Sequence, residues 1–171
     1  MSTPALTNQI ATDIANMQLL LTEKGSSVSG VATSGTGEDN LSSISITAGD
    51  LNNTGSLSIQ AAGYSVGNNG RRCVRLYFGS KDMVCFDAGI SGSWIIDATI
   101  MCISTASQSI IVNSYWSCNG VNPYYSNHSV RYYQATEDTT STITVKCTGE
   151  CSNSGDWITQ CMMLVRQTMV G

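Results

Sequence analysis

The sequence has little charge: Lys, Arg, Asp and Glu make up 12% of its 171 residues, about half the usual share of a soluble domain. Its 8 basic residues are outnumbered by 12 acidic ones, so the net charge is -4. Nucleic-acid binding needs a basic surface that neutralises phosphates, and none can be built from this composition. We therefore expect no nucleic-acid partner.

Long hydrophobic runs are also missing, since no stretch approaches the roughly 18 apolar residues that a membrane-spanning helix needs. The N-terminus shows no basic segment followed by an apolar core and a cleavage site. We therefore expect no membrane partner, and synthesis in a cytoplasm without export by the general secretory route.

Candidate catalytic groups are scarce. The only histidine, His128, lies in the turn-like segment SNHS, and a Ser-His-Asp or Cys-His site would have to centre on it. Glu137 and Asp138 are adjacent, so in a strand they would point to opposite faces and could not form a glycosidase pair. No glycine-rich loop stands between a strand and a helix. The sequence predicts no enzyme, no catalytic residue and no cofactor.

Seven cysteines are present, an odd number, and several fall inside strand patterns where a thiol acts as a small apolar side chain. This favours buried free thiols. The candidate disulfide is Cys147 with Cys151, which flank a predicted turn in KCTGECSN. A zinc site would need a second Cys/His pair at ligand spacing, and none follows, so no metal is expected.

One helix is predicted, over residues 1–25. Thr3 before Pro4 suits its first turn and Gly25 its end. Apolar residues recur on one face at intervals of three and four. These candidate partner-binding residues are Leu6, Ile10, Ile14, Met17 and Leu21. The stripe must be covered by the chain's own domain, by its copies or by another protein. Residues 26–40 are rich in Gly, Ser and Thr and have no period, so they predict a flexible connector arm.

From residue 41 to 171 the pattern changes to alternating strands bounded by Gly, Asn or Asp. About nine strand candidates, with turns every 8 to 12 residues, indicate an all-β fold. Since no helical crossover separates them, neighbouring strands should be antiparallel. The predicted head is an antiparallel β-sandwich, jelly-roll-like, preceded by the helix and the extended arm.

An aromatic cluster occupies residues 113–133, among Asn and Ser side chains. Aromatic rings beside amides suit loops that bind sugars or proteins, because the ring supplies area and the amide orientation. The same rings could instead pack the end of the sandwich. The candidate ligand-binding residues are Tyr115, Trp116, Tyr124, Tyr125, Tyr132 and Tyr133.

Residues 40–168 resemble a β-sandwich domain that recurs in structural proteins of tailed-bacteriophage virions. The segments that carry the resemblance are AAG at 61–63, GNNG at 67–70, LYFG at 76–79, FDAG at 86–89 and GSW at 92–94. The segments STITVKCTG and DWITQCMMLVRQ resemble its last two strands. None of these motifs is catalytic; together they form a packing signature.

The resemblance implies a structural virion protein, commonly a homotrimer. An arm followed by a compact head favours a capsid decoration (cement) protein, which would bind and stabilise the lattice of the major capsid protein on the outer capsid surface. A head fibre is a related possibility. The alternative is a tail-fibre or baseplate head that binds a host receptor or glycan through the aromatic cluster.

Overall fold

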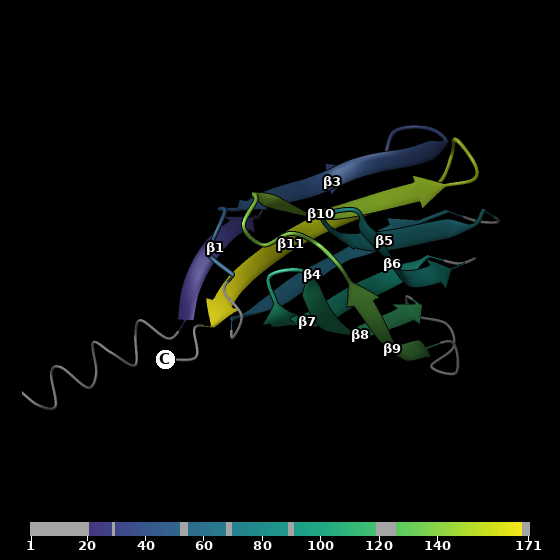
Figure 1. The fold of residues 1–171 in the computed structure, drawn as a ribbon. Coiled ribbons are helices and arrows are strands. Elements are labelled where there is room, and N and C mark those ends of the chain that lie inside the picture. The colour runs from purple at the N-terminus through teal and green to yellow at the C-terminus, as the bar shows by residue number, and fades with distance from the viewer. Residues whose placement is uncertain are drawn as a thin grey trace, which may run out of the picture.

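The strands of this chain lie in two stacked sheets (Figure 1). The computed structural model describes residues 21–28, 30–51, 55–67, 70–88, 91–118 and 126–168. The strands are β1 (Leu21–Ser27), β2 (Val31–Ala32), β3 (Gly37–Ile46), β4 (Ser56–Val66), β5 (Arg72–Phe78), β6 (Lys81–Ala88), β7 (Gly92–Ser104), β8 (Ser107–Cys118), β9 (Ser126–Ala135), β10 (Ile143–Cys151) and β11 (Trp157–Thr168). Among the described residues no helix is long and apolar enough to span a bilayer.

The larger sheet, which we call sheet A, has the order β1-β11-β4-β7-β8-β9, and β2 also pairs with β11. The smaller sheet, sheet B, has the order β3-β10-β5-β6. Every pairing is antiparallel. The predicted all-β antiparallel sandwich is therefore confirmed.

The strand order is that of a jelly roll. If β2 and the β8–β9 hairpin are set aside, the first remaining strand pairs with the last (β1 with β11), and the second with the last but one (β3 with β10). The other four strands continue the two sheets in the same nested way, as two interlocked Greek keys do. The β8–β9 hairpin adds two strands to the edge of sheet A beyond β7.

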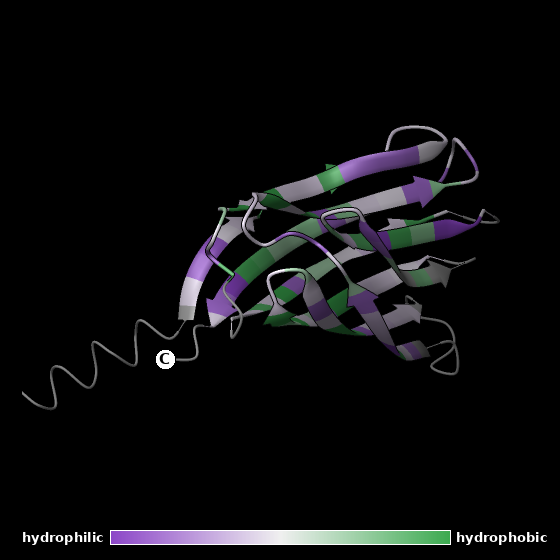
Figure 2. Cartoon of the chain, in the orientation of Figure 1, coloured by the Kyte–Doolittle hydropathy of each residue, from purple (hydrophilic) through white to green (hydrophobic). Residues whose placement is uncertain are grey.

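The core lies between the sheets and follows from the period of two. In β7, Trp94, Ile96, Ala98 and Ile100 are buried, while the residues between them point away from the core. Figure 2 shows hydrophobic and hydrophilic residues interspersed along the strands. Gly63 lies opposite Trp94 on the neighbouring strand, and a side chain at Gly63 would overlap the indole ring. The lack of a side chain at Gly63 therefore leaves room for Trp94, the largest fully buried side chain.

A tight turn follows Phe78. Phe78 pairs with Lys81, so only Gly79 and Ser80 connect β5 to β6. Gly79 has a φ of 58°, a left-handed conformation that glycine adopts without steric cost.

The sandwich begins earlier than the sequence predicts. Residues 1–20 of the predicted helix lie outside the described residues, whereas residues 21–25 form strand β1 rather than a helical end. The stretch 26–40, predicted as a flexible connector, contains the end of β1, all of β2 and the start of β3. Here pairing with β11 and β10 supplies order that the local Gly/Ser/Thr-rich sequence does not indicate.

Candidate binding surface

An exposed apolar surface covers the outward side of the last three strands of sheet A. Because side chains alternate along a strand, the burial of one set in β7 and β8 leaves the other set facing solvent. This second set contains large apolar residues among the polar residues that usually cover an outer sheet face. We call it the β7–β9 face, and its members are Ile95, Met101, Ile103, Ile111, Tyr115, Val130 and Tyr132.

The strand register makes this surface continuous. Ile95 lies directly opposite Tyr115, and Ile111 lies directly opposite Tyr132. Val130 lies opposite Asn113, which places it diagonally between Ile111 and Tyr115. Directly opposed side chains have Cβ atoms about 5 Å apart, and diagonal neighbours remain within reach of long side chains.

The polar groups on this surface are neutral or already hydrogen-bonded. The hydroxyls of Ser109 and Tyr132 lie 3.0 Å apart, and the Gln134 amide donates to the Tyr132 hydroxyl at 3.4 Å. These two hydrogen bonds lower the pKa of Tyr132 below its ordinary value. The Gln60 amide of β4 donates to the Asp97 carboxylate of β7 at 3.0 Å. The charge of Asp97 is therefore hydrogen-bonded across two neighbouring strands.

Only part of the predicted aromatic cluster belongs to this surface. Tyr115 and Tyr132 are exposed, whereas Trp116 is buried and Tyr133 packs against the core. Lys81 lies over the Tyr133 ring, with its Nζ 5.5 Å from the centroid. Tyr115 and Trp116 are consecutive in a strand, as are Tyr132 and Tyr133. Consecutive side chains of a strand point to opposite sides of the sheet, so one of each pair is exposed and the other is not. Tyr124 and Tyr125 lie outside the described residues.

The aliphatic members of the β7–β9 face were missed by the sequence reasoning. The sequence nevertheless contained a sign of this face. In "WIIDATIMCI", apolar residues occupy both the positions that face the core and the alternate positions that face away from it. Ile95, Met101 and Ile103 occupy the parity that should have been polar in a strand with one solvated face. A strand that is apolar on both sides predicts two covered faces.

Most of the predicted partner-binding stripe cannot be placed. Leu6, Ile10, Ile14 and Met17 lie outside the described residues. Leu21 opens β1, at the edge of sheet A, where it pairs with Thr168 in the backbone register. The segment that precedes the sandwich therefore joins it at an edge strand.

The candidate disulfide is not formed. Cys147 and Cys151 are both buried free thiols of the single strand β10, where the sequence predicted a turn. Residues four apart in a strand are about 13 Å apart, and a disulfide requires Cα atoms within about 7 Å. Cys73 and Cys102 are also free and buried, and Cys161 is free and exposed. Burial raises the pKa of Cys102 and, against an opposing hydrogen bond from Thr33, that of Cys151.

The outer side of sheet B is charged, in contrast to the β7–β9 face. Arg75 Nη1 lies 2.6 Å from Glu150 Oε2 and 3.7 Å from a Glu38 carboxylate oxygen. The hydroxyls of Thr148 and Tyr77 donate to Glu38 at 2.6 and 2.8 Å. Burial alone would raise the pKa of Glu38, but these hydrogen bonds and the Arg75 charge outweigh it, so its pKa is lowered.

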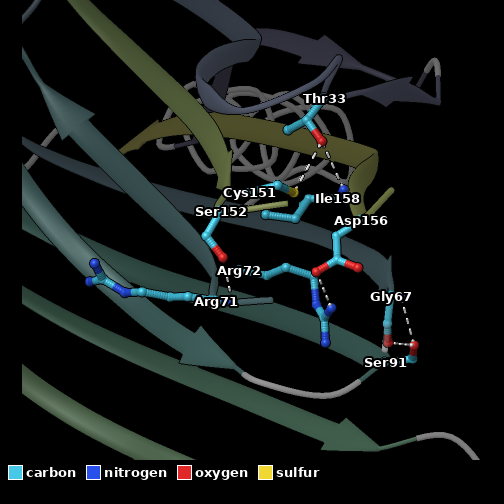
Figure 3. A network of polar contacts seen from close by, with 9 residues as sticks. All are labelled: Thr33, Gly67, Arg71, Arg72, Ser91, Cys151, Ser152, Asp156 and Ile158. Atoms are coloured by element: carbon cyan, nitrogen blue, oxygen red, sulfur yellow. Dashed lines mark hydrogen bonds and ion pairs between the residues drawn. The ribbon is translucent and has the colours of Figure 1, made fainter. Parts of the chain in front are cut away.

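A buried polar network ties together loops at one end of the sandwich (Figure 3). Arg72 and Asp156 form an ion pair at 3.0 Å, and Arg72 is fully buried. Gly67 and Gly70 pass so close that a side chain at either would overlap the Asp156 carboxylate. The Thr33 hydroxyl accepts from the Ile158 amide at 3.0 Å and contacts the Cys151 thiol at 3.4 Å.

The described residues contain no group of three or more His, Cys, Asp or Glu side chains that could hold a metal ion. His128 is exposed on β9 and pairs across the strands with Tyr115, so it lies in a strand rather than in the predicted turn.

No protein-family model and no curated protein matches this chain. Among solved structures, it is similar to the VP2 subviral particle of infectious bursal disease virus, at 15% identity, with a TM-score of 0.37 over 85% of this chain and 32% of that one. It thus spans about a third of the VP2 chain. It is also similar to the lectin UEA-II complexed with galactose (9% identity, TM-score 0.45, 88% and 94% covered) and to lectin I of Ulex europaeus in complex with a methyl fucoside (8%, 0.39, 86% and 92%). Similarity at this level says nothing about activity.

Proposed function

We propose that this chain is a non-enzymatic structural protein of a tailed-bacteriophage virion, a decoration (cement) protein that binds the major capsid lattice as a homotrimer. The observation that carries the proposal is the β7–β9 face, an extended and nearly uncharged surface of large apolar side chains on a rigid sheet. Such surfaces mark protein–protein contacts. The resemblance of residues 40–168 to virion sandwich domains supports a virion as the assembly in which these contacts are made.

The arm supplies the capsid contact in this proposal. Residues 1–20 precede an edge strand, and their sequence carries apolar residues at helical spacing. A helix that buries Leu6, Ile10, Ile14 and Met17 on the capsid would anchor the chain without involving the sandwich core. Linking several arms in one oligomer turns weak single contacts into strong overall binding, because the second and third arms bind at high effective concentration.

The test is binding to capsids that have been purified without this protein. Replacing Ile14 and Met17 with Asp should abolish co-sedimentation, because two charges on the stripe cannot be buried against an apolar groove. The matched control is Asn8→Asp with Asn16→Asp, which adds the same charge on the other side of the predicted helix and should bind normally. Unchanged binding of the Ile14/Met17 variant would contradict the proposal.

A receptor- or glycan-binding head is the second candidate, favoured by the exposed rings of Tyr115 and Tyr132 beside Asn113 and Gln134. A flat sugar ring can stack on such aromatic side chains while amides bond its hydroxyls. Trp116 is buried, so tryptophan fluorescence would report such binding poorly. The better test is retention on immobilised host glycans, which Tyr115→Ala and Tyr132→Ala should each reduce if this function holds.

A further inference from the structure

We propose that the β7–β9 face is the surface through which copies of this chain pack against one another. The occupant of this face is a second copy of the chain, in a closed symmetric assembly. The inference concerns the purified protein alone and does not depend on capsid binding. It rests on the homotrimer of the proposed function and names its interface, and its test, which uses no capsid, can fail while capsid binding through the arm persists.

The first argument is area. The most exposed members are Ile103 at 62%, Val130 at 60% and Tyr132 at 59%. With about 200 Å² for a fully exposed large side chain, the seven residues together present roughly 750 Å². The largest apolar patch of an ordinary monomer is about 300–600 Å². A stable interface takes about 800 Å² from each partner. The face is therefore larger than a monomer usually leaves open and nearly sufficient for one side of a stable contact.

The second argument is charge. Of the residues of β7, β8 and β9 that point the same way as this face, Asp97 is the only acid and no Lys or Arg is among them. Asp97 is hydrogen-bonded to Gln60 within its own sheet. A symmetric contact brings identical surfaces together, so charges near its axis would repel their own copies. A neutral apolar face avoids that repulsion, whereas the acidic groups that give the chain its net charge of -4 can stay at a distance.

The third argument is the position of the face at a protected sheet edge. β9 is the last strand of sheet A, and no other strand of the described residues pairs with its outer edge. Arg131 projects to the opposite side of β9 from Val130 and Tyr132, and an inward-pointing charge of this kind opposes the continuation of a sheet into a neighbouring molecule. Copies therefore associate by packing faces, which yields a closed assembly rather than an open fibre.

The experiment is the mass of the full chain in solution, measured by light scattering with reductant present so that the exposed Cys161 cannot cross-link copies. The wild type should show a multiple of 18.2 kDa. Val130→Glu with Tyr132→Glu should shift it to a single chain at the same concentration. We expect a dissociation constant raised at least about 100-fold, because like charges would be buried opposite each other.

The matched control is Ser43→Glu with Ser45→Glu. Both serines are exposed, two residues apart, on β3, the edge strand of sheet B, so this variant adds the same charge at an equivalent place on the other sheet. It should retain the wild-type mass. A wild type that is a single chain would overturn the inference, and so would a Val130/Tyr132 variant that keeps the wild-type mass. A single-chain wild type whose capsid binding needs Val130 and Tyr132 would also overturn it and would assign the face to the capsid.

Hydrogen exchange on the wild type keeps the inference testable if the charged variant fails to fold. Amides of Ser126–Ala135 should exchange more slowly in concentrated than in dilute solution, whereas amides of β3 should exchange equally in both. Exchange of β9 that does not depend on concentration would refute self-association through this face.

Discussion

At the scale of single residues, Glu38 organises the outer side of sheet B. Its carboxylate accepts the hydroxyls of Tyr77 and Thr148 and faces the Arg75 guanidinium. Lys146 adds a second positive charge and lies over the Tyr77 ring, with its Nζ 4.3 Å from the centroid. The hydroxyl of Tyr77 is thereby fixed as a donor, since it faces an ionised acceptor.

This arrangement predicts an unusual tyrosine titration. The pKa of Tyr77 is raised from 10.0 to about 12, mainly by burial and secondly by the hydrogen bond to Glu38. Because the folded pKa is the higher one, the stability that Tyr77 contributes is complete below pH 10 and is lost as the pH rises through 12. Ultraviolet absorbance of tyrosinate should show a transition near pH 12 that is missing in Tyr77→Phe. Glu38→Gln should move it towards 10.0. A Tyr77 that titrates with the exposed tyrosines would contradict this.

Residue identity alone left both exposure and packing open for the aromatic cluster, whereas the structure exposes Tyr115 and Tyr132 and packs their neighbours Trp116 and Tyr133 against the core. A sequence position shows that a residue is aromatic, whereas the side it faces depends on the register of its strand, and a shift of one residue exchanges the two sides. The predicted disulfide between Cys147 and Cys151 also depended on pairings that a local stretch of sequence does not show. A turn between Cys147 and Cys151 would have brought the thiols together, but the pairing of β10 with β3 and β5 extends the strand through both.

At the scale of elements, the Arg72–Asp156 pair links the start of β5 to the loop before β11. Asp156→Ala should lower the free energy of unfolding by about 3–5 kcal/mol, because it leaves a fully buried guanidinium without its partner charge. Arg72→Met combined with Asp156→Leu should recover most of that loss, since an apolar pair has no charge to desolvate. Chemical denaturation of the three proteins provides the measurement.

A partly exposed ion pair gives the control for this prediction. Glu150→Ala removes the closest carboxylate from Arg75 on the outer side of sheet B, and such a pair contributes about 1 kcal/mol or less. If Asp156→Ala costs no more than Glu150→Ala, the buried pair does not hold the loop in place.

Which elements the sequence predicted depended on how local their signals were. The turn at Gly79 and the alternation in β4, β5 and β7 are local features, and the structure has them. β1 (LTEKGSS) and β2 (VA) have no local strand signal, because these residues become strands only by pairing with β11, more than a hundred residues later.

At the scale of the whole molecule, the nesting of the jelly roll joins the two ends of the described chain. β1 pairs with β11, and β11 lies between β1 and β4 within sheet A. A buried contact also connects the sheets: the Gln160 amide of β11 donates to the Ser42 hydroxyl of β3 at 2.7 Å. The sequence predicted a jelly-roll-like sandwich from the number and spacing of strands, but not which segments would pair, since the pairings join distant parts of the chain. Neither sheet is built from a continuous part of the chain.

That interleaving predicts that the two sheets unfold as one cooperative unit. Val165 in β11 of sheet A and Val145 in β10 of sheet B are both fully buried in the common core. Replacing either with Ala should lower the free energy of unfolding by about 2 kcal/mol, from two lost methyl groups and the cavity they leave. The highly exposed Val28 is the control, and Val28→Ala should change stability by less than about 0.5 kcal/mol. In urea, tryptophan fluorescence and far-ultraviolet circular dichroism should give the same midpoint for each variant, because strands from all parts of the chain alternate between the sheets. Separate midpoints, with Val165→Ala moving one and Val145→Ala the other, would show that sheet A can come apart while sheet B stays folded.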